Sequence, residues 1–290
     1  MKVSSSVLVL AAALGASARP SGHAHQQAHN VRRDFVVANK PVTITQYATQ
    51  VVGATAATDV PDAVYEAATP KTSSGSSSGS GSGYKEFCGG KKSKRATAEE
   101  IAYEGNTGTE DDFGCNMMTV DSSVADKYKY TATFKNAGSE EQECVCFNKI
   151  GPDGLINGFW SGNEAIKFSV AAKGSQVVAF DENTQGGCAC GAGEVPLTAI
   201  GQFASTWLEL DVGNVSNKKW SGADASCLVS AAENLDIPGL KVCGHGTCST
   251  INPGGTGENA YLGGMEAEDG VGLNLAPGKV RLEVIVDYKG

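Results

Sequence analysis

The residues best suited to chemistry gather in the run Trp207-Leu-Glu-Leu-Asp211. If this run is a β-strand, alternate side chains share a face, which puts Trp207, Glu209 and Asp211 together. An indole ring can stack on a sugar ring while neighbouring carboxylates accept hydrogen bonds from its hydroxyls. The run therefore predicts a glycan-binding surface. Two alternatives stay open: a pair of carboxylates about 5 to 10 Å apart that hydrolyses a glycosidic bond, and an ordinary solvated sheet face whose tryptophan is packed under a loop.

Other catalytic or metal-binding groupings have little support. The only histidine after residue 83 is His245, so a serine–histidine or cysteine–histidine arrangement would have to be built around it. The motif Cys243-Gly-His-Gly-Thr-Cys248 has ligand types that suit zinc, but cysteines in an exported chain indicate disulfides instead. We therefore expect no catalytic residue, no metal ion and no cofactor.

Cysteines are confined to the part of the chain after residue 83. There are nine of them, all disulfide candidates: Cys88, Cys115, Cys144, Cys146, Cys188, Cys190, Cys227, Cys243 and Cys248. The odd number leaves one thiol unpaired, and on the order of a thousand pairings remain possible. In each Cys-x-Cys pair, at 144/146 and 188/190, both side chains would leave a strand on the same side and reach different partners.

The chain divides into three segments. Residues 1–18 carry an apolar stretch, Val7–Leu14, followed by small residues up to Ala18, which predicts a cleaved export signal. The apolar stretch is too short to span a bilayer, so we expect no membrane anchor. Residues 19–83 lack cysteines and end in an uninterrupted Gly/Ser run, which predicts a disordered pro-segment and linker. Residues 84–290 form the expected globular domain.

The charge of the predicted domain argues against one class of partner. The whole chain has a formal net charge of −9. Residues 84–290 contain 17 Lys and Arg against 28 Asp and Glu, a net charge of −11. Because an acidic surface repels phosphate backbones, we expect no nucleic-acid partner. We expect a monomer that is secreted to the medium or the cell wall.

The pattern of apolar residues favours a mainly β fold. Alternation or short apolar runs predict strands over 128–134, 166–170, 177–180, 206–212 and 280–288. Short strands between Gly- and Asn-rich turns are typical of a disulfide-bonded β-sandwich. Two helices are expected: one over 98–103, after a capping box that begins at Thr97, and one over 221–235. The sequon Asn214-Val-Ser216 predicts N-glycosylation in a turn after the strand that carries Trp207.

A resemblance to a known family rests on three long runs, Gly201–Asn214, Trp220–Val229 and Cys248–Ala267. In these runs the chain resembles the Asp f 4-like family of fungal secreted allergens. The resemblance implies an extracellular or cell-wall location in a filamentous fungus and recognition by host IgE, and it implies no established catalytic activity. The order of a CxCG motif, an acidic strand and Gly-Ala-Asp is also loosely similar to thaumatin-like β-sandwiches, whose cleft is acidic.

Together these observations lead to one expected function and one alternative. We expect a secreted, non-catalytic, allergen-type protein that is associated with cell-wall polysaccharide and bound by host IgE. The alternative is a secreted glycan-active hydrolase that uses the carboxylates of the strand from Trp207 to Asp211.

Overall fold

The computed structural model describes residues 83–90, 105–268 and 270–290, which belong to one compact unit. The predicted export signal and nearly all of the predicted linker lie outside the described residues, as does the helix expected over 98–103. The domain boundaries therefore stay predictions. Within the described residues, no helix combines the length and the apolar character needed to cross a bilayer.

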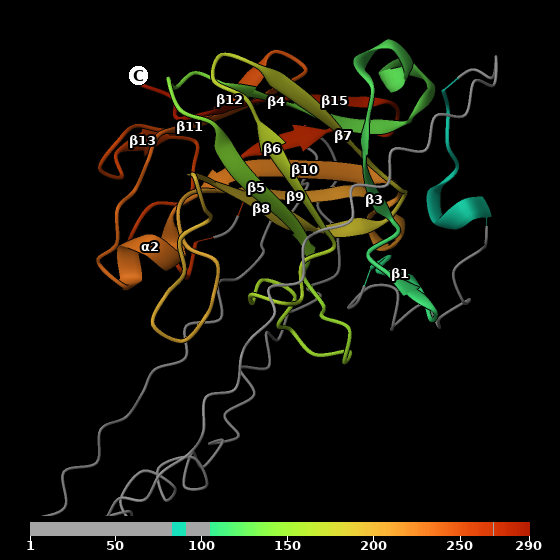
Figure 1. Ribbon diagram of the computed structural model, residues 1–290, viewed down its shortest axis with the longest axis horizontal. Coiled ribbons are helices and arrows are strands. Elements are labelled where there is room, and N and C mark those ends of the chain that lie inside the picture. Colours follow the sequence, from blue (N-terminus) through green and yellow to red (C-terminus); the bar gives the residue numbers. More distant parts are fainter. Residues whose placement is uncertain (1–82, 91–104, 269) are drawn as a thin grey trace, which may run out of the picture. The chain divides into compact units, whose positions relative to one another are not determined.

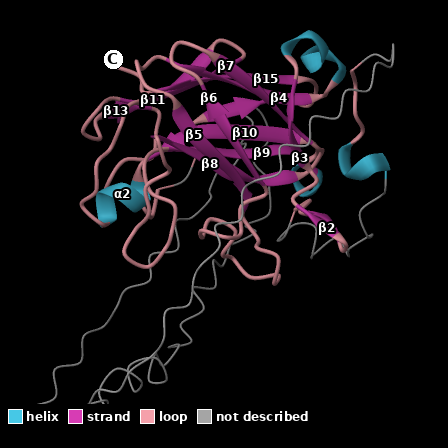
Figure 2. Ribbon diagram, in the orientation of Figure 1, coloured by secondary structure: helices cyan, strands magenta, loops and turns pink. Residues whose placement is uncertain are grey.

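Two β-sheets packed face to face make up most of the described chain, and the helices within it are short (Figures 1 and 2). The six-stranded sheet has the order β14 (Leu273–Leu275), β10 (Trp220–Ser226), β9 (Trp207–Asn214), β8 (Thr184–Ala192), β5 (Gln142–Asn148) and β6 (Ile166–Val170). The seven-stranded sheet has the order β13 (Gly257–Glu258), β12 (Thr247–Ile251), β11 (Leu240–Gly244), β15 (Val280–Val286), β4 (Tyr130–Asn136), β7 (Ser175–Phe180) and β3 (Met117–Val120). The predicted disulfide-bonded β-sandwich is confirmed.

Short elements complete the described chain. A two-stranded ribbon pairs β1 (Gly108–Thr109) with β2 (Asp112–Phe113). The helices are the 3-10 helices η1 (Phe87–Gly90), η2 (Ser122–Lys127) and η3 (Val215–Asn217) and the α-helix α2 (Leu228–Ala232).

The last strand, β15, joins the two halves of the seven-stranded sheet. It pairs antiparallel with β11 on one side and parallel with β4 on the other, where Val284 lies opposite Phe134. Val280, Leu282, Val284 and Val286 are all buried, as the alternation of apolar residues predicts. The strand ends at Val286 because Asp287 adopts a left-handed conformation, with φ of 52°.

The core between the sheets is apolar and contains two disulfides. Cys144 lies directly opposite Cys190, and Cys146 opposite Cys188, on the antiparallel strands β5 and β8. The bridges Cys144–Cys190 and Cys146–Cys188 join these pairs and belong to the cluster of buried side chains that both sheets contribute. Each Cys-x-Cys pair thus points to one side of its strand, as expected.

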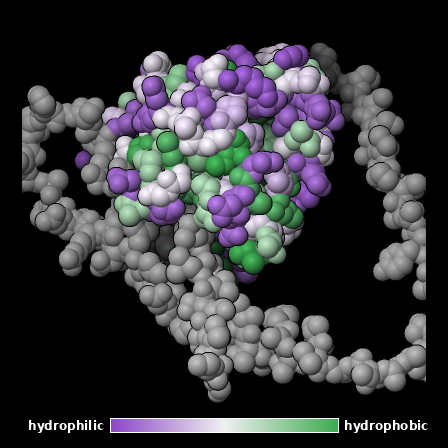
Figure 3. All heavy atoms as spheres, turned by 90° about the vertical axis from the view of Figure 1, so that its left-hand side faces the viewer, coloured by the Kyte–Doolittle hydropathy of each residue, from purple (hydrophilic) through white to green (hydrophobic). Residues whose placement is uncertain are grey.

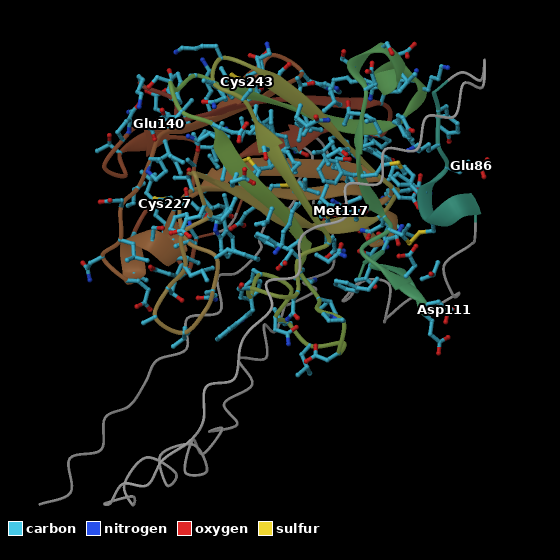
Figure 4. All side chains as sticks on the ribbon, in the orientation of Figure 1. Glu86, Asp111, Met117, Glu140, Cys227 and Cys243 are labelled. Atoms are coloured by element: carbon cyan, nitrogen blue, oxygen red, sulfur yellow. A yellow bond between two sulfur atoms is a disulfide. The ribbon has the colours of Figure 1, made fainter. Side chains whose placement is uncertain are left out.

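The other two bridges are Cys88–Cys115, which ties η1 to the segment before β3, and Cys243–Cys248, which closes the turn between β11 and β12. Because both sulfurs of the Cys243–Cys248 motif are joined, they are not thiolates available to zinc. Cys227 is the free cysteine and is buried; Figure 4 marks it next to α2.

The predicted helix over 221–235 is largely wrong. Residues Trp220–Ser226 form β10, inside the six-stranded sheet between β9 and β14, and only Leu228–Ala232 is helical. The small residues of this stretch suit a helix, but here Ala223 and Ala225 fill the core beneath neighbouring strands. Pairing on both sides and burial of both faces outweigh local propensity.

The adjacent bridges of β5 and β8 generate a prediction about stability. They close loops of 42 and 46 residues that nearly coincide, so either bridge alone restricts the unfolded chain almost as much as both. We expect the Cys146→Ala/Cys188→Ala variant to lose little unfolded-state constraint, whereas removal of both bridges should cost about 4 kcal/mol beyond the loss of packing. Urea unfolding of Cys146→Ala/Cys188→Ala, of Cys144→Ala/Cys190→Ala and of the variant that combines all four substitutions measures this coupling.

The matched control is a quadruple variant that combines Cys146→Ala/Cys188→Ala with Cys243→Ala/Cys248→Ala, because the Cys243–Cys248 bridge closes a separate loop. The losses of unfolding free energy from these two bridges should add. Additive losses within the β5–β8 pair of bridges would contradict the prediction.

Candidate functional site

The side chains of Trp207, Glu209 and Asp211 share one face of β9, as the alternation predicts, but this face is covered. Trp207 is 1% exposed and Glu209 0%, while Asp211 is half-buried. The opposite face carries Leu208 and Leu210, which belong to the core between the sheets. The expected surface for a sugar is therefore not at the surface.

Two loops, 149–165 and 193–206, cover Trp207. Its ring packs against Phe147 and Phe159, with centroids 5.0 and 5.8 Å away, and Phe203 stacks on Phe147 at 5.7 Å. The indole N–H donates to the carbonyl of Ala204 at 3.2 Å. A sugar ring cannot stack on Trp207 while these side chains occupy its faces, so the tryptophan packs the loops onto the sheet.

Glu209 lies opposite Asp224 of β10, and both side chains are 0% exposed. The strand register thus brings two carboxyls together on neighbouring strands. Burial raises the pKa of the Asp224 carboxyl well above its usual range, and the negative charge of Glu209 raises it further. The segment around Gly272 lies directly over Asp224: a Cβ on this glycine, whose φ is +100°, would stand 2.6 Å from the Asp224 Cβ.

A more polar strip continues along the same face. Asp211 lies opposite Gln185 of β8, whose side-chain oxygen accepts a hydrogen bond from the Lys149 ammonium at 2.8 Å. Burial lowers the pKa of Lys149, and the negative charge of Asp211 opposes that shift. Asp211 also accepts a hydrogen bond from the Asn214 side chain. This strip orders the end of β9 and the turn after it.

Asn214, the predicted glycosylation site, ends β9 and caps η3. Its side-chain oxygen accepts a hydrogen bond from the Asn217 N–H at 3.0 Å. The residue is half-buried. Its glycosylation stays a prediction.

The covering loops carry a feature that sequence reasoning missed. Four of the seven large hydrophobic residues that are exposed in the described chain lie on them: Leu155, Ile156, Leu197 and Ile200. A hollow of about 430 Å³ opens there, lined by Leu155, Ile156, Asn157, Phe159, Trp160, Asn163 and Gln202. An isolated bridge between Trp160 and Gln202 joins the two loops. In the sequence, the adjacent aromatic residues Phe159 and Trp160, which stand between Gly158 and Gly162, are the feature that could have indicated this hollow.

The polar groups of this hollow are neutral and partly unused. Gln202 is 4% exposed, yet its side-chain amide forms no hydrogen bond with any described residue, and neither does the indole N–H of half-buried Trp160. The Asn163 amide donates to the carbonyl of Asn157, which leaves its own oxygen as an acceptor. The hollow therefore offers apolar surface together with free donors and acceptors of hydrogen bonds.

No group of three or more His, Cys, Asp or Glu side chains in the described ranges could hold a metal ion. The fully buried carboxyls of Glu209 and Asp224 also give a substrate no access to a pair of acids.

Comparison with known proteins defines the class. The model of the Allergen Asp f 4-like domain matches residues 115–286, more than half of the chain, and the chain belongs to this family. The particular relative is Allergen Asp f 4 of Aspergillus fumigatus, 37% identical over 193 residues, which are 65% of this chain and 59% of that protein. The match thus spans less than two thirds of the relative. Among solved structures, the protein elicitor MoHrip2 of Magnaporthe oryzae aligns with a TM-score of 0.34 at 12% identity, over 55% of this chain and 99% of its own.

The buried acid pair generates a pH-dependent prediction. Because the pKa of Asp224 is raised in the folded protein, the unfolded carboxyl ionises first as pH rises above about 4. Folding stability should therefore fall with rising pH, by about 1.4 kcal/mol for each pH unit in which only the unfolded group is ionised. Asp224→Asn cannot ionise, so it should flatten this decline and be more stable than wild type at pH 7, with the advantage vanishing below pH 4.

Thermal unfolding from pH 3 to pH 8 measures the difference. Glu233→Gln, at an exposed carboxyl after α2, is the matched control and should keep the wild-type slope. If the stability of Asp224→Asn fell with rising pH as steeply as that of wild type, the buried pair of Asp224 and Glu209 would not be the cause of the decline.

Proposed function

We propose that this chain is an exported, non-catalytic protein of the fungal cell wall or its surroundings that binds a neutral polysaccharide. The observation that carries the proposal is the hollow at Trp160, where an aromatic ring and unsatisfied amides lie beside exposed aliphatic side chains. Its lining contains no charged residue.

This lining suits a sugar chain for chemical reasons. A pyranose ring has an apolar C–H face, which an indole ring can contact, and hydroxyls at its rim. The amide of Gln202 offers both a donor and an acceptor to those hydroxyls. Isolated exposed hydrophobic residues are ordinary, but Leu155 and Ile156 line the same hollow beside Phe159 and Trp160, as expected of a binding surface. A charged polymer would leave its charges without partners here.

Export is part of the proposal. Eight cysteines are paired in four disulfides, and such bridges persist in oxidising compartments. Mass spectrometry of protein from the culture medium should find all four bridges and a mature form that lacks residues 1–18. A reduced protein retained in the cytosol would contradict export.

Recognition by host IgE is proposed from the family relationship alone. It is tested by binding of the refolded protein to IgE in sera that react with Allergen Asp f 4. This property concerns the host and is independent of the ligand at Trp160.

Retention on insoluble glucan and chitin tests the binding proposal. Trp160→Ala should reduce retention at least about tenfold, since it removes the aromatic contact, and Gln202→Leu should weaken retention while its volume stays similar. Trp220→Ala is the matched control, because Trp220 is half-buried but lies on β10, away from the hollow.

Trp207→Ala is unsuitable, since a core cavity of this size costs about 3 to 5 kcal/mol and would unfold part of the protein. Equal retention of Trp160→Ala and wild type would contradict the proposal that the hollow at Trp160 binds a polysaccharide. Release of reducing sugar from either polymer would contradict its non-catalytic part.

A further inference from the structure

A second opening lies between the two sheets, at the end of the sandwich where the C-terminus lies (left in Figure 1). It is a cleft of about 790 Å³, within the range of small-molecule sites. Its floor consists of core side chains from both sheets: Phe134, Leu240 and Val286 from one, and Leu208, Cys188 and Cys190 from the other. Figure 3, which looks at this side, shows hydrophobic residues gathered in the middle of the face with hydrophilic residues around them.

Two polar side chains inside the cleft have no partner. Gln142 and Thr206 line it and are 6% and 5% exposed. Neither side chain forms a hydrogen bond with any described residue. Neither residue is among those whose polar atoms are fully enclosed without a partner, so these atoms are open to the cleft. Here a ligand with hydrogen-bond donors would satisfy either oxygen atom.

The rim of the cleft is acidic. Glu140, Glu194 and Asp236 line it, are exposed and form no ion pair with described residues. A fourth acid, Asp287, is paired with Lys289, with 2.5 Å between Oδ1 and Nζ. Figure 4 shows Glu140 at this left-hand end of the molecule. The uncompensated charge therefore favours a cation.

From these three features we infer that the cleft binds a small primary ammonium carried on an apolar chain. The ammonium has three donors, and Gln142 Oε1 on β5 or Thr206 Oγ1 just before β9 can accept from it under the acidic rim. The chain lies on the floor formed by Phe134, Leu208 and Val286. This site is separate from the hollow at Trp160, so the two proposals can fail independently.

Calorimetry with n-hexylamine, n-octylamine, n-octanol and octanoate tests the inference on the intact protein. Octylamine should bind more tightly than hexylamine, by up to about fourfold for each added methylene. Octanoate should bind at least about tenfold more weakly than octylamine, since its charge meets the acidic rim. Added salt should weaken the binding of the two amines but not the binding of octanol.

Two matched variants localise the binding. Ala192→Trp fills the mouth of the cleft from an exposed position at the end of β8 and should abolish octylamine binding, whereas Ala199→Trp, also exposed but outside the cleft, should bind as wild type does. Asp236→Asn combined with Glu140→Gln should weaken binding about fivefold. The inference is overturned if octylamine does not bind, if octanoate binds equally well, or if Ala192→Trp binds as tightly as wild type. Trp160→Ala should leave octylamine binding unchanged.

Discussion

The position of β15 in the seven-stranded sheet is the constraint on which the fold depends. This strand is hydrogen-bonded to β11 on one side and to β4, about 150 residues earlier in the chain, on the other. Without it, β3, β7 and β4 would be separated from β11, β12 and β13, and the sheet that packs against the six-stranded sheet would be in two pieces. Val284 beside Phe134 places the pairing at the centre of the core.

Burial of both faces of the six-stranded sheet decides where function can lie. One face packs on the other sheet, and loops 149–165 and 193–206 with α2 cover Trp207 and its aromatic neighbours on the second face. Trp207 on this second face therefore supports the loops instead of meeting a ligand. Two openings in the described chain lie elsewhere: the hollow on the outer side of those loops and the cleft at one end of the sandwich.

Parts of this arrangement were predictable from the sequence. Alternation located β9 and β15, and the shared face of Trp207 and Glu209, because a period of two follows from strand geometry. It could not show what covers that face, since loops far along the chain do so. The partner of Asp224 depends on the register between β9 and β10, and β10 itself was missed because small residues favour no strand. The hollow and the cleft each combine side chains from separate segments, which local patterns do not specify.

The location of the disulfides has a mechanical consequence. Two bridges join β5 to β8 within one sheet, and one closes the hairpin of β11 and β12 within the other. In the described residues no sulfur bridge links the two sheets. Their separation is resisted by apolar packing and by a few hydrogen bonds, such as those from the Asn136 amide to the Val170 carbonyl and from the Ala225 N–H to the Ser249 hydroxyl. The sandwich is therefore rigid within each layer and compliant between layers, and force applied across the layers would part them at the open end while every covalent crosslink stays intact.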